Sequence, residues 1–388
     1  MIFPGISLFL KEIASGYRFL YRTRKAEKTI IFYAEHAGYY PYLEGLITEL
    51  TGRHGQTLCY VTSDPDDPVF QKSIPGIKPF YFNKLLPFLM AFLSCRLFVM
   101  TLTDLNQFHL RRSVNNVHYV YVFHALLSTH MVYRYGAFDH YDSILCCGPH
   151  HVTEIRKHER ASKLEPKILV EAGYYRLERI YQAYRNYSPA RSSQGTGKTV
   201  LIAPSWGVAN TLETYGELLT EVLLEAGYNV IVRPHPETVR RSPDLMTLFA
   251  SRFGGNLKFT LETSVITDDS LLRADVLICD ISGIALEYAF GAERPVLFLD
   301  VPLKIHNPRF RELEIEPLEL TLRSEIGVVV SLDKIEAIPR AVASLMENRA
   351  LYQRRIAELR KQNIYAFGHS SEIGAQHIID MAARRGTN

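Results

Sequence analysis

The sequence alternates short runs of β-branched and aromatic residues with longer amphipathic segments, and this alternation limits the folds open to the chain. In the first half such runs fall at six places: residues 29–35, 57–63, 96–102, 118–123, 143–148 and 167–173. Strands that alternate with helices in this way form a parallel sheet covered by helices. We therefore predict an α/β fold.

The alternation restarts after residues 181–198, a stretch that is rich in Ser, Gly, Pro and Arg and has no apolar periodicity. We interpret this stretch as a linker, because 388 residues exceed one ordinary core. Two Rossmann-like domains that face a cleft are expected, with ligands beyond the carboxyl ends of their strands. The predicted order is a basic amphipathic segment, an acceptor domain, the linker, a donor-nucleotide domain and a helix that returns to the first domain: residues 1–28, 29–180, 181–198, 199–365 and 366–388.

Composition limits the function classes. The chain is 47% hydrophobic and 22% charged with a net charge of +3, as in soluble globular proteins, so nucleic acid is not an expected partner. The cysteines lie in apolar runs without metal-type spacing, which indicates buried thiols in a reduced compartment. The longest apolar stretch is interrupted by Pro87 and Arg96 and falls short of a membrane span. We expect a cytoplasmic protein.

Polar residues and glycines follow three predicted strands of the second domain: Ser205, Trp206, Gly207, Arg233, His235, Asp280, Ser282 and Gly283. The free N–H groups of a helix that opens at Ser282 favour a phosphate there. Glu287, about one turn into that helix, is a candidate for binding a ribose hydroxyl pair. In the alternative interpretation, Asp280 and Ser282 only cap the helix.

His235 stands between two prolines, Pro234 and Pro236. Because proline restricts its own backbone and that of the residue before it, the imidazole is held with little freedom. A histidine with a purely structural role seldom needs such fixing, so we interpret His235 as a site residue.

The first domain offers a counterpart in His124, which follows the run at 118–123. The alternative for this residue is a histidine satisfied within the core. Glu35, His36 and Gly38 lie in the first predicted strand-to-helix loop, where an acceptor pocket is usual, although turn chemistry alone also explains Gly38.

With these residues in view, the chain resembles the CDP-glycerol glycerophosphotransferase family, enzymes of teichoic acid and capsule polymer biosynthesis with a two-domain GT-B type fold. The resemblance rests on "RPHPE" at 233–237, on the segment 274–300 and on Phe123-His124, and it covers residues 30–380. It implies His124 and His235 as the catalytic pair and Asp280, Ser282 and Gly283 at the donor. The family's Trp-His-Gly-Thr-Pro motif is here Phe123-His124-Ala125-Leu126, and its Ser-Ser pair is here Ser282-Gly283.

The expected reaction moves glycerol phosphate, or a related polyol phosphate, from a CDP-alcohol donor to a glycan or polyprenyl-linked acceptor and releases CMP. His124 is expected to act as the base, and His235 with Arg233 to stabilise charge on the pyrophosphate. Because the sequence has no Asp-x-Asp or carboxylate cluster, we expect neither a metal nor a cofactor. The alternatives are a GT-B nucleotide-sugar glycosyltransferase, a UDP-sugar 2-epimerase and, from another class, a non-catalytic scaffold.

The N-terminal segment 1–28 mixes apolar residues with Arg and Lys, as helices that lie on membranes do. An ordinary amphipathic helix docked on the first domain is the alternative. If the segment binds anionic lipid, the enzyme is peripheral on the inner face of the plasma membrane.

Overall fold

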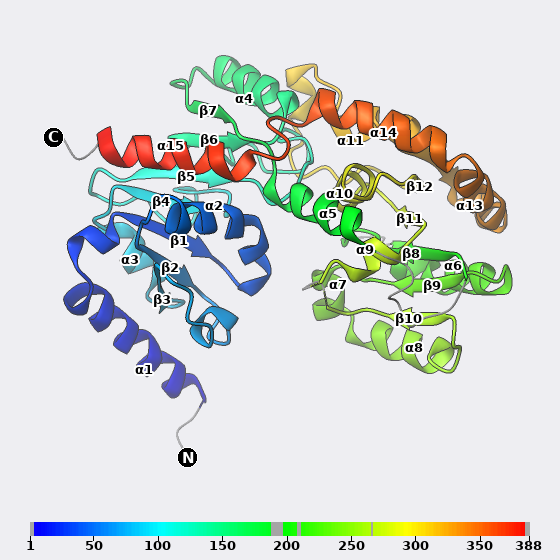
Figure 1. Ribbon diagram of the computed structural model, residues 1–388, viewed down its shortest axis with the longest axis horizontal. Helices are drawn as coiled ribbons and strands as arrows, with labels where there is room; N and C mark the ends of the chain where they lie inside the picture. Colours follow the sequence, from blue (N-terminus) through cyan, green and yellow to red (C-terminus); the bar gives the residue numbers. More distant parts are fainter. Residues whose placement is uncertain (1–3, 188–196, 208–210, 265–266, 385–388) are drawn as a thin grey trace. The chain divides into compact units, whose positions relative to one another are not determined.

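The computed structural model describes residues 4–187, 197–207, 211–264 and 267–384, and its contacts divide the chain into two units (Figure 1). The first unit holds the chain up to His124, then Tyr133–Tyr175 and the chain from Ile364 onward. The second holds Ala125–Val132 and Arg176–Asn363. Each unit is built on its own parallel sheet, so the fold is α/β with two Rossmann-like domains, as predicted.

The described part of the first unit has a seven-stranded parallel sheet in the order β3-β2-β1-β4-β5-β6-β7. The strands are β1 (Ile30–Ala34), β2 (Leu58–Thr62), β3 (Ile77–Tyr81), β4 (Leu97–Met100), β5 (His118–Val122), β6 (Ser143–Cys146) and β7 (Ile168–Glu171). The helices are α1 (Pro4–Tyr17), α2 (Tyr40–Gly52), α3 (Leu86–Phe92), α4 (Pro149–Ser162) and α15 (Ser370–Arg384). Shorter helical turns are η1 (Arg18–Arg22), η2 (Lys25–Lys28), η3 (Ala37–Tyr39) and η4 (Pro68–Phe70).

The described part of the second unit has a six-stranded parallel sheet in the order β10-β9-β8-β11-β12-β13. The strands are β8 (Thr199–Ile202), β9 (Asn229–Val232), β10 (Phe259–Leu261), β11 (Val276–Cys279), β12 (Val296–Asp300) and β13 (Gly327–Ser331). The helices are α5 (Tyr175–Asn186), α6 (Thr211–Glu225), α7 (Pro236–Arg241), α8 (Pro243–Phe253), α9 (Asp269–Arg273), α10 (Gly283–Ala292), α11 (Leu318–Thr321), α12 (Arg323–Ile326), α13 (Ile338–Glu347) and α14 (Arg349–Asn363), with the turns η6 (Phe310–Leu313) and η7 (Leu332–Ala337).

Helix α15 packs against α2 in the first unit, at the end of the chain that the sequence assigns to a returning helix. Ala375 and Ile378 of α15 join Leu43 and Leu46 of α2 in one buried apolar cluster. The two helices approach closely at Gly45, where an added Cβ would lie 2.2 Å from the Ser371 hydroxyl and 2.3 Å from the Tyr175 ring.

The boundaries differ from the prediction in two places. The units divide between Tyr175 and Arg176, so the predicted linker at 181–198 falls within the second unit. Helix α5 extends to Asn186 and contains the first residues of this stretch, while residues 188–196 lie outside the described part of the chain. The apolar periodicity fades there because aromatic rings take over the packing: the guanidinium of Arg360 lies 4.4 Å above the Tyr181 ring, and that of Arg349 donates to the Tyr184 hydroxyl.

A short stretch after β5, Ala125–Val132, belongs to the second unit although it lies within the predicted first domain. The Ser128 backbone N–H donates to the Glu319 carboxylate at 2.9 Å, and its hydroxyl donates to the same group at 2.6 Å. Both residues are buried, so this pair ties the stretch to α11. Strand β3 was not predicted; it is an edge strand and contains Pro79, which is tolerated only at sheet edges.

We predict opposite effects for the same substitution at two glycines of α2. Gly45→Ala should lower the free energy of unfolding by roughly 1–3 kcal/mol, because the added methyl group overpacks the contact with α15. Gly52→Ala, where nothing lies within 4 Å of the added Cβ, should raise it by up to ~1 kcal/mol through helix propensity. Urea unfolding followed by circular dichroism measures both. Equal effects of the two substitutions would contradict this packing.

Candidate functional site

The second unit brings three of the predicted strand ends together, because β9, β8 and β11 are neighbours in its sheet. The chain order reverses between β8 and β11, which is the point where open α/β sheets bind ligands. Ser205 follows β8, His235 follows β9 and Asp280 follows β11. The residues predicted from these strand ends therefore lie at one edge of one sheet.

Asp280 connects the segments at this edge. Its side chain is almost completely buried, at 1% exposure. One carboxylate oxygen, Oδ1, accepts the backbone N–H of Ser205 at 2.8 Å, and Oδ2 accepts the Thr211 hydroxyl at 3.3 Å and the Lys304 ammonium at 3.4 Å. Asp280 thus ties the loops after β8 and β12, together with the start of α6, to the end of β11.

Lys304 was not predicted, although it belongs to the loop that follows β12. Its ammonium also donates to the Ser205 hydroxyl and to the Trp206 carbonyl, the latter at 2.8 Å. Its side chain remains 24% exposed, so one cation is both held by this cluster and open to solvent. Applying the strand-end rule to β12 points to Asp300-Val301-Pro302 and stops two residues short of Lys304.

His235 caps α7: its Nδ1 accepts the backbone N–H of Glu237 at 3.1 Å. When the ring is neutral its proton must therefore reside on Nε2, which makes His235 a hydrogen-bond donor. Burial lowers the pKa of His235 to about 4. The negative charge of Glu237 opposes this shift, and the positive charge of Lys304 adds to it. The ring lies 6.0 Å from that of Trp206, and the Arg241 guanidinium lies 4.8 Å from the Trp206 ring.

Helix α10 begins at Gly283, after Ser282 in an extended conformation. The Ser282 side chain makes no capping hydrogen bond, and Asp280 is engaged by the loops instead. Neither side chain therefore caps α10, contrary to the simple capping interpretation. The start of this ten-residue helix is half-buried beside Ala125 and Leu127, and it carries the positive end of the helix dipole, which favours an anion.

Two predicted donor residues have other partners. Arg233 is 3% exposed, and its guanidinium donates to the Ser270 hydroxyl at 2.8 Å and to the Thr267 carbonyl at 3.1 Å. Glu287, expected to meet a ribose, forms an ion pair with Arg176 at 2.9 Å. These buried contacts give Arg233 and Glu287 a role in supporting the site from within the unit.

In the first unit, His124 lies beyond the carboxyl end of β5 among three tyrosine rings. The ring centroids of Tyr39, Tyr42 and Tyr133 lie 5.4, 6.1 and 6.2 Å from that of His124. Burial lowers the pKa of His124 to about 4, and a hydrogen bond with the Thr101 backbone partly opposes this shift. The tyrosines were not predicted as site residues; Tyr39 and Tyr42 stand three apart at the first strand-to-helix junction.

The protonation of His124 follows from its contacts. Its Nδ1 is buried and has no hydrogen-bond partner among the residues that the structure describes. We assign the Thr101 backbone contact to Nε2, because Nδ1 has no partner, and place the proton of the neutral ring there. The lone pair on Nδ1 is left unprotonated, as a general base requires.

The loop after β1 connects to this histidine through Tyr39. His36 caps the short helix η3, with its Nδ1 accepting the backbone N–H of Gly38 at 3.1 Å. The His36 ring centroid lies 4.6 Å from that of Tyr39, which in turn contacts His124. Burial raises the pKa of Glu35. The predicted acceptor residues and His124 thus lie at one edge of the first sheet.

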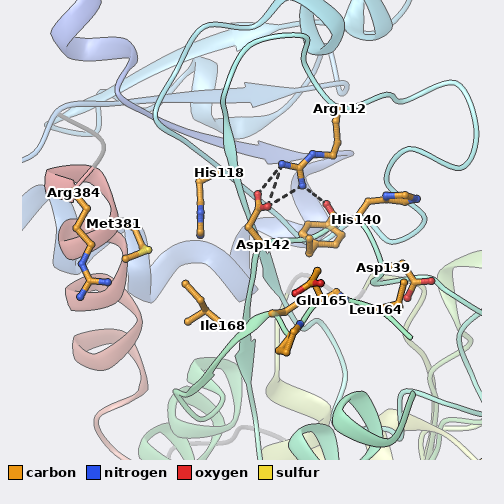
Figure 2. Close-up of a pocket in the computed structure, with 13 residues that line it drawn as sticks. Arg112, His118, Asp139, His140, Asp142, Leu164, Glu165, Ile168, Met381 and Arg384 are labelled. Atoms are coloured by element: carbon orange, nitrogen blue, oxygen red, sulfur yellow. Dashed lines mark hydrogen bonds and ion pairs between the residues drawn. The ribbon is translucent and has the colours of Figure 1, made fainter. Parts of the chain in front are cut away.

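A separate cavity of about 670 Å³ opens in the first unit at the opposite ends of its strands (Figure 2). It is bordered by His118 at the start of β5, by Asp142 just before β6 and by Met381 of α15. Arg112 also lines it and pairs with the Asp142 carboxylate at 2.9 Å. None of the predicted site residues lines this cavity.

Over the described residues, no group of three or more His, Cys, Asp or Glu side chains could hold a metal ion. Within the same part of the chain, no helix has the length and apolar character needed to cross a membrane.

Neither a protein-family model nor a curated protein matches the sequence. Solved structures do match. A structure of the wall teichoic acid polymerase TagF soaked with CDPG covers 98% of both chains, with a TM-score of 0.63 at 14% identity. MnaA of S. aureus with UDP has a TM-score of 0.58 at 13% identity, covering 89% of this chain and 94% of MnaA. A structure named as a putative UDP-N-acetylglucosamine 2-epimerase from Listeria monocytogenes has a TM-score of 0.56 at 12% identity, covering 89% of this chain and 94% of that one. At these identities the likeness establishes the fold, which is of the GT-B type.

We predict that the ring of His235 titrates with a midpoint of about 4 in the unliganded protein. Its Cε1–H resonance, assigned as the signal lost in His235→Gln, measures this. Since the pKa in the folded state lies below the ~6.5 of the unfolded chain, the folded state binds fewer protons. The free energy of unfolding should therefore fall as the pH drops from ~6.5 towards 4, and fall less in His235→Gln.

The exposed His109 offers a matched control, because His109→Gln should leave both the His235 titration and the pH dependence unchanged. A midpoint near 6.5 for His235 would contradict the effect of its burial.

Proposed function

We propose that the protein transfers an alcohol phosphate, most simply glycerol phosphate, from a CDP-alcohol to a hydroxyl group of a glycan or lipid-linked acceptor, releasing CMP. The observation that carries this proposal is the cluster of donors that follow β9, β11 and β12. It combines the Lys304 ammonium, the Nε2–H of His235 and the start of α10. These groups suit a pyrophosphate, and the fold shared with TagF supports the same class of donor.

The two histidines suit different steps. An acceptor hydroxyl attacks the distal phosphorus and forms a new P–O bond, while the bond between that phosphorus and the bridging oxygen breaks. The electron pair goes to the phosphate of CMP, and the hydroxyl proton goes to Nδ1 of His124, which holds a free lone pair. Because a phosphate monoester has a second pKa of ~6, CMP leaves without strong acid assistance.

His235 is better suited to binding charge than to removing a proton. With Nδ1 occupied by Glu237 N–H, its neutral ring offers only an N–H donor. A positioned donor of this kind, aimed at charge that develops on phosphate oxygens, contributes roughly 10²–10³ in rate. The proposal therefore assigns the base to His124 and the charge-stabilising contact to His235.

His235→Ala should lower the rate of CMP release from CDP-glycerol at least about a hundredfold, because it removes a charge-stabilising donor. His124→Ala should lower it by roughly 10²–10⁴, the usual contribution of a general base. Coupled detection of CMP with wild type, the two variants and the control His109→Ala measures this, and circular dichroism checks the fold. Release near the wild-type rate by either folded variant would exclude its assigned role.

A second candidate is a GT-B nucleotide-sugar enzyme, either a glycosyltransferase or a UDP-sugar 2-epimerase. It is favoured by the fold shared with MnaA, whose structure holds UDP. Incubation of the wild type with a panel of CDP-alcohols, UDP-sugars and GDP-sugars separates the two. CMP from a CDP-alcohol supports the first proposal, whereas UDP or GDP release supports the second.

We further propose that α1 binds an anionic membrane surface, because its polar side is the one docked on the protein. The Glu12 carboxylate accepts the backbone N–H groups of Asn83 and Leu85 at 2.5 and 2.6 Å. The Ser15 hydroxyl accepts the N–H of Tyr81 at 3.2 Å. Soluble helices usually dock their apolar side, so this arrangement leaves apolar residues outside.

The outer side of α1 and η1 exposes a row of large apolar side chains: Ile6, Phe9, Leu10, Ile13, Tyr17, Leu20 and Tyr21. Phe88 and Phe92 are also exposed on α3, which starts directly after the loop that Glu12 holds. Exposed basic side chains lie in the same region: Arg22, Arg24, Lys25 and Lys84. Apolar anchors combined with Lys and Arg are what an anionic interface binds.

The substitution pair Leu10→Glu/Ile13→Glu should reduce binding to vesicles that contain anionic lipid more than about tenfold, because two apolar anchors are lost. Leu257→Glu, at an exposed leucine of the second unit, is the matched control and should bind as wild type. Co-sedimentation measures binding. These point variants are preferable to deleting residues 1–26, which would also remove the buried Phe19. Undiminished binding of the double variant would contradict this role of α1.

A further inference from the structure

Lys304 is a cation at the carboxyl edge of the second sheet that both contacts the strand-end loops and stays open to solvent. Its ammonium bridges the loop after β8, through the Ser205 hydroxyl and the Trp206 carbonyl, to Asp280 at the end of β11. Ser205 and Trp206 are neutral acceptors that water can replace. A lysine ammonium has rotatable donors on a flexible stem, so it can exchange such acceptors at little cost.

The surroundings require a cation here if an anion is to bind. Asp280 is buried and ionisable, and it lies three residues before the start of α10. A phosphate placed at that helix start would meet the negative charge of Asp280 in a region of low dielectric, where like charges repel strongly. Lys304 lies against that carboxylate, whereas Arg233, which also follows a strand of this edge, is buried against Ser270 and Thr267.

We propose that Lys304 positions the diphosphate of the nucleotide donor: its ammonium leaves the Ser205 hydroxyl and the Trp206 carbonyl, keeps Asp280, and contacts a phosphate oxygen. This inference deepens the proposed function, since it names the group that recognises the donor's diphosphate. When Lys304 moves to the phosphate, the loop after β8 loses two of its contacts, those of the Ser205 hydroxyl and the Trp206 carbonyl. The hydrogen bond from Ser205 N–H to Asp280 remains. The lysine thus holds the loop in the empty site and the phosphate in the filled one.

The chain supplies its own reporter for this exchange. Trp206 is the only tryptophan in the sequence. Lys304 binds its backbone carbonyl, and its ring lies near both His235 and Arg241. Tryptophan fluorescence therefore reads this loop alone, without labelling and without turnover.

The experiment titrates the full chain with cytidine, CMP and CDP, and with UDP in parallel, following Trp206 emission. Wild-type affinity should rise from the nucleoside to the diphosphate. Lys304→Met should weaken CDP binding at least about tenfold, CMP binding less and cytidine binding hardly at all, because the lysine recognises charge on phosphate. Lys304→Arg should recover most of the CDP affinity. The control Lys258→Met, at an exposed lysine of the same unit, should bind as wild type.

Lys304→Gln keeps a donor for the Trp206 carbonyl but no charge, so it separates the two roles of the side chain and replaces Lys304→Met if that variant does not fold. Equal losses for cytidine, CMP and CDP in these variants would show a purely structural lysine and overturn the inference. Undiminished CDP binding, or a wild type that binds neither CDP nor UDP, would overturn it too. A phosphate-dependent loss without CMP release from any CDP-alcohol would leave Lys304 assigned and reject the proposed reaction.

Discussion

The buried carboxylate of Asp280 is the interaction on which the second unit's site depends. A charge at 1% exposure is costly unless hydrogen bonds and an opposite charge compensate it. Ser205 N–H, the Thr211 hydroxyl and the Lys304 ammonium do so. Because these three groups come from three different segments, satisfying one carboxylate fixes the loops after β8 and β12 and the start of α6 around the end of β11.

The two histidines share a lowered pKa but differ in which ring nitrogen is occupied. Each sits beyond the carboxyl end of a strand and has its pKa lowered to about 4 by burial, so both rings are neutral near pH 7. What separates them is the atom that their neighbours occupy. Glu237 N–H takes Nδ1 of His235, while the Thr101 contact leaves Nδ1 of His124 without a partner among the described residues. Burial sets the charge of each ring, and one hydrogen bond decides whether it can donate or accept.

Periodicity in the sequence was sufficient for most of the fold. The apolar runs marked β1 and β11 because strands of a parallel sheet are buried on both faces and read as continuous apolar segments. The same reasoning missed β3, whose edge position tolerates Pro79 and partial exposure. It also placed the division between the domains too late in the chain, at 181–198 where the units divide after Tyr175, because the last turns of α5 pack through tyrosine rings and arginines and carry no aliphatic pattern.

For the site, the rule about strand ends predicted which loops meet but not how their charges pair. It brought Ser205, Trp206, His235 and Asp280 to one edge, where the structure has them. It could not reveal that the guanidinium of Arg233 is buried against Ser270, whereas the ammonium of Lys304 pairs with Asp280 and stays partly exposed. Such pairing depends on side chains that are distant in the sequence.

Transfer of an alcohol phosphate with release of CMP can be followed by ³¹P NMR of the wild type with CDP-glycerol and an acceptor alcohol. We expect the diphosphate signals to decay while CMP and a new phosphodiester appear in equal amounts. Unchanged CDP-glycerol under conditions where a UDP-sugar is consumed to UDP would contradict it.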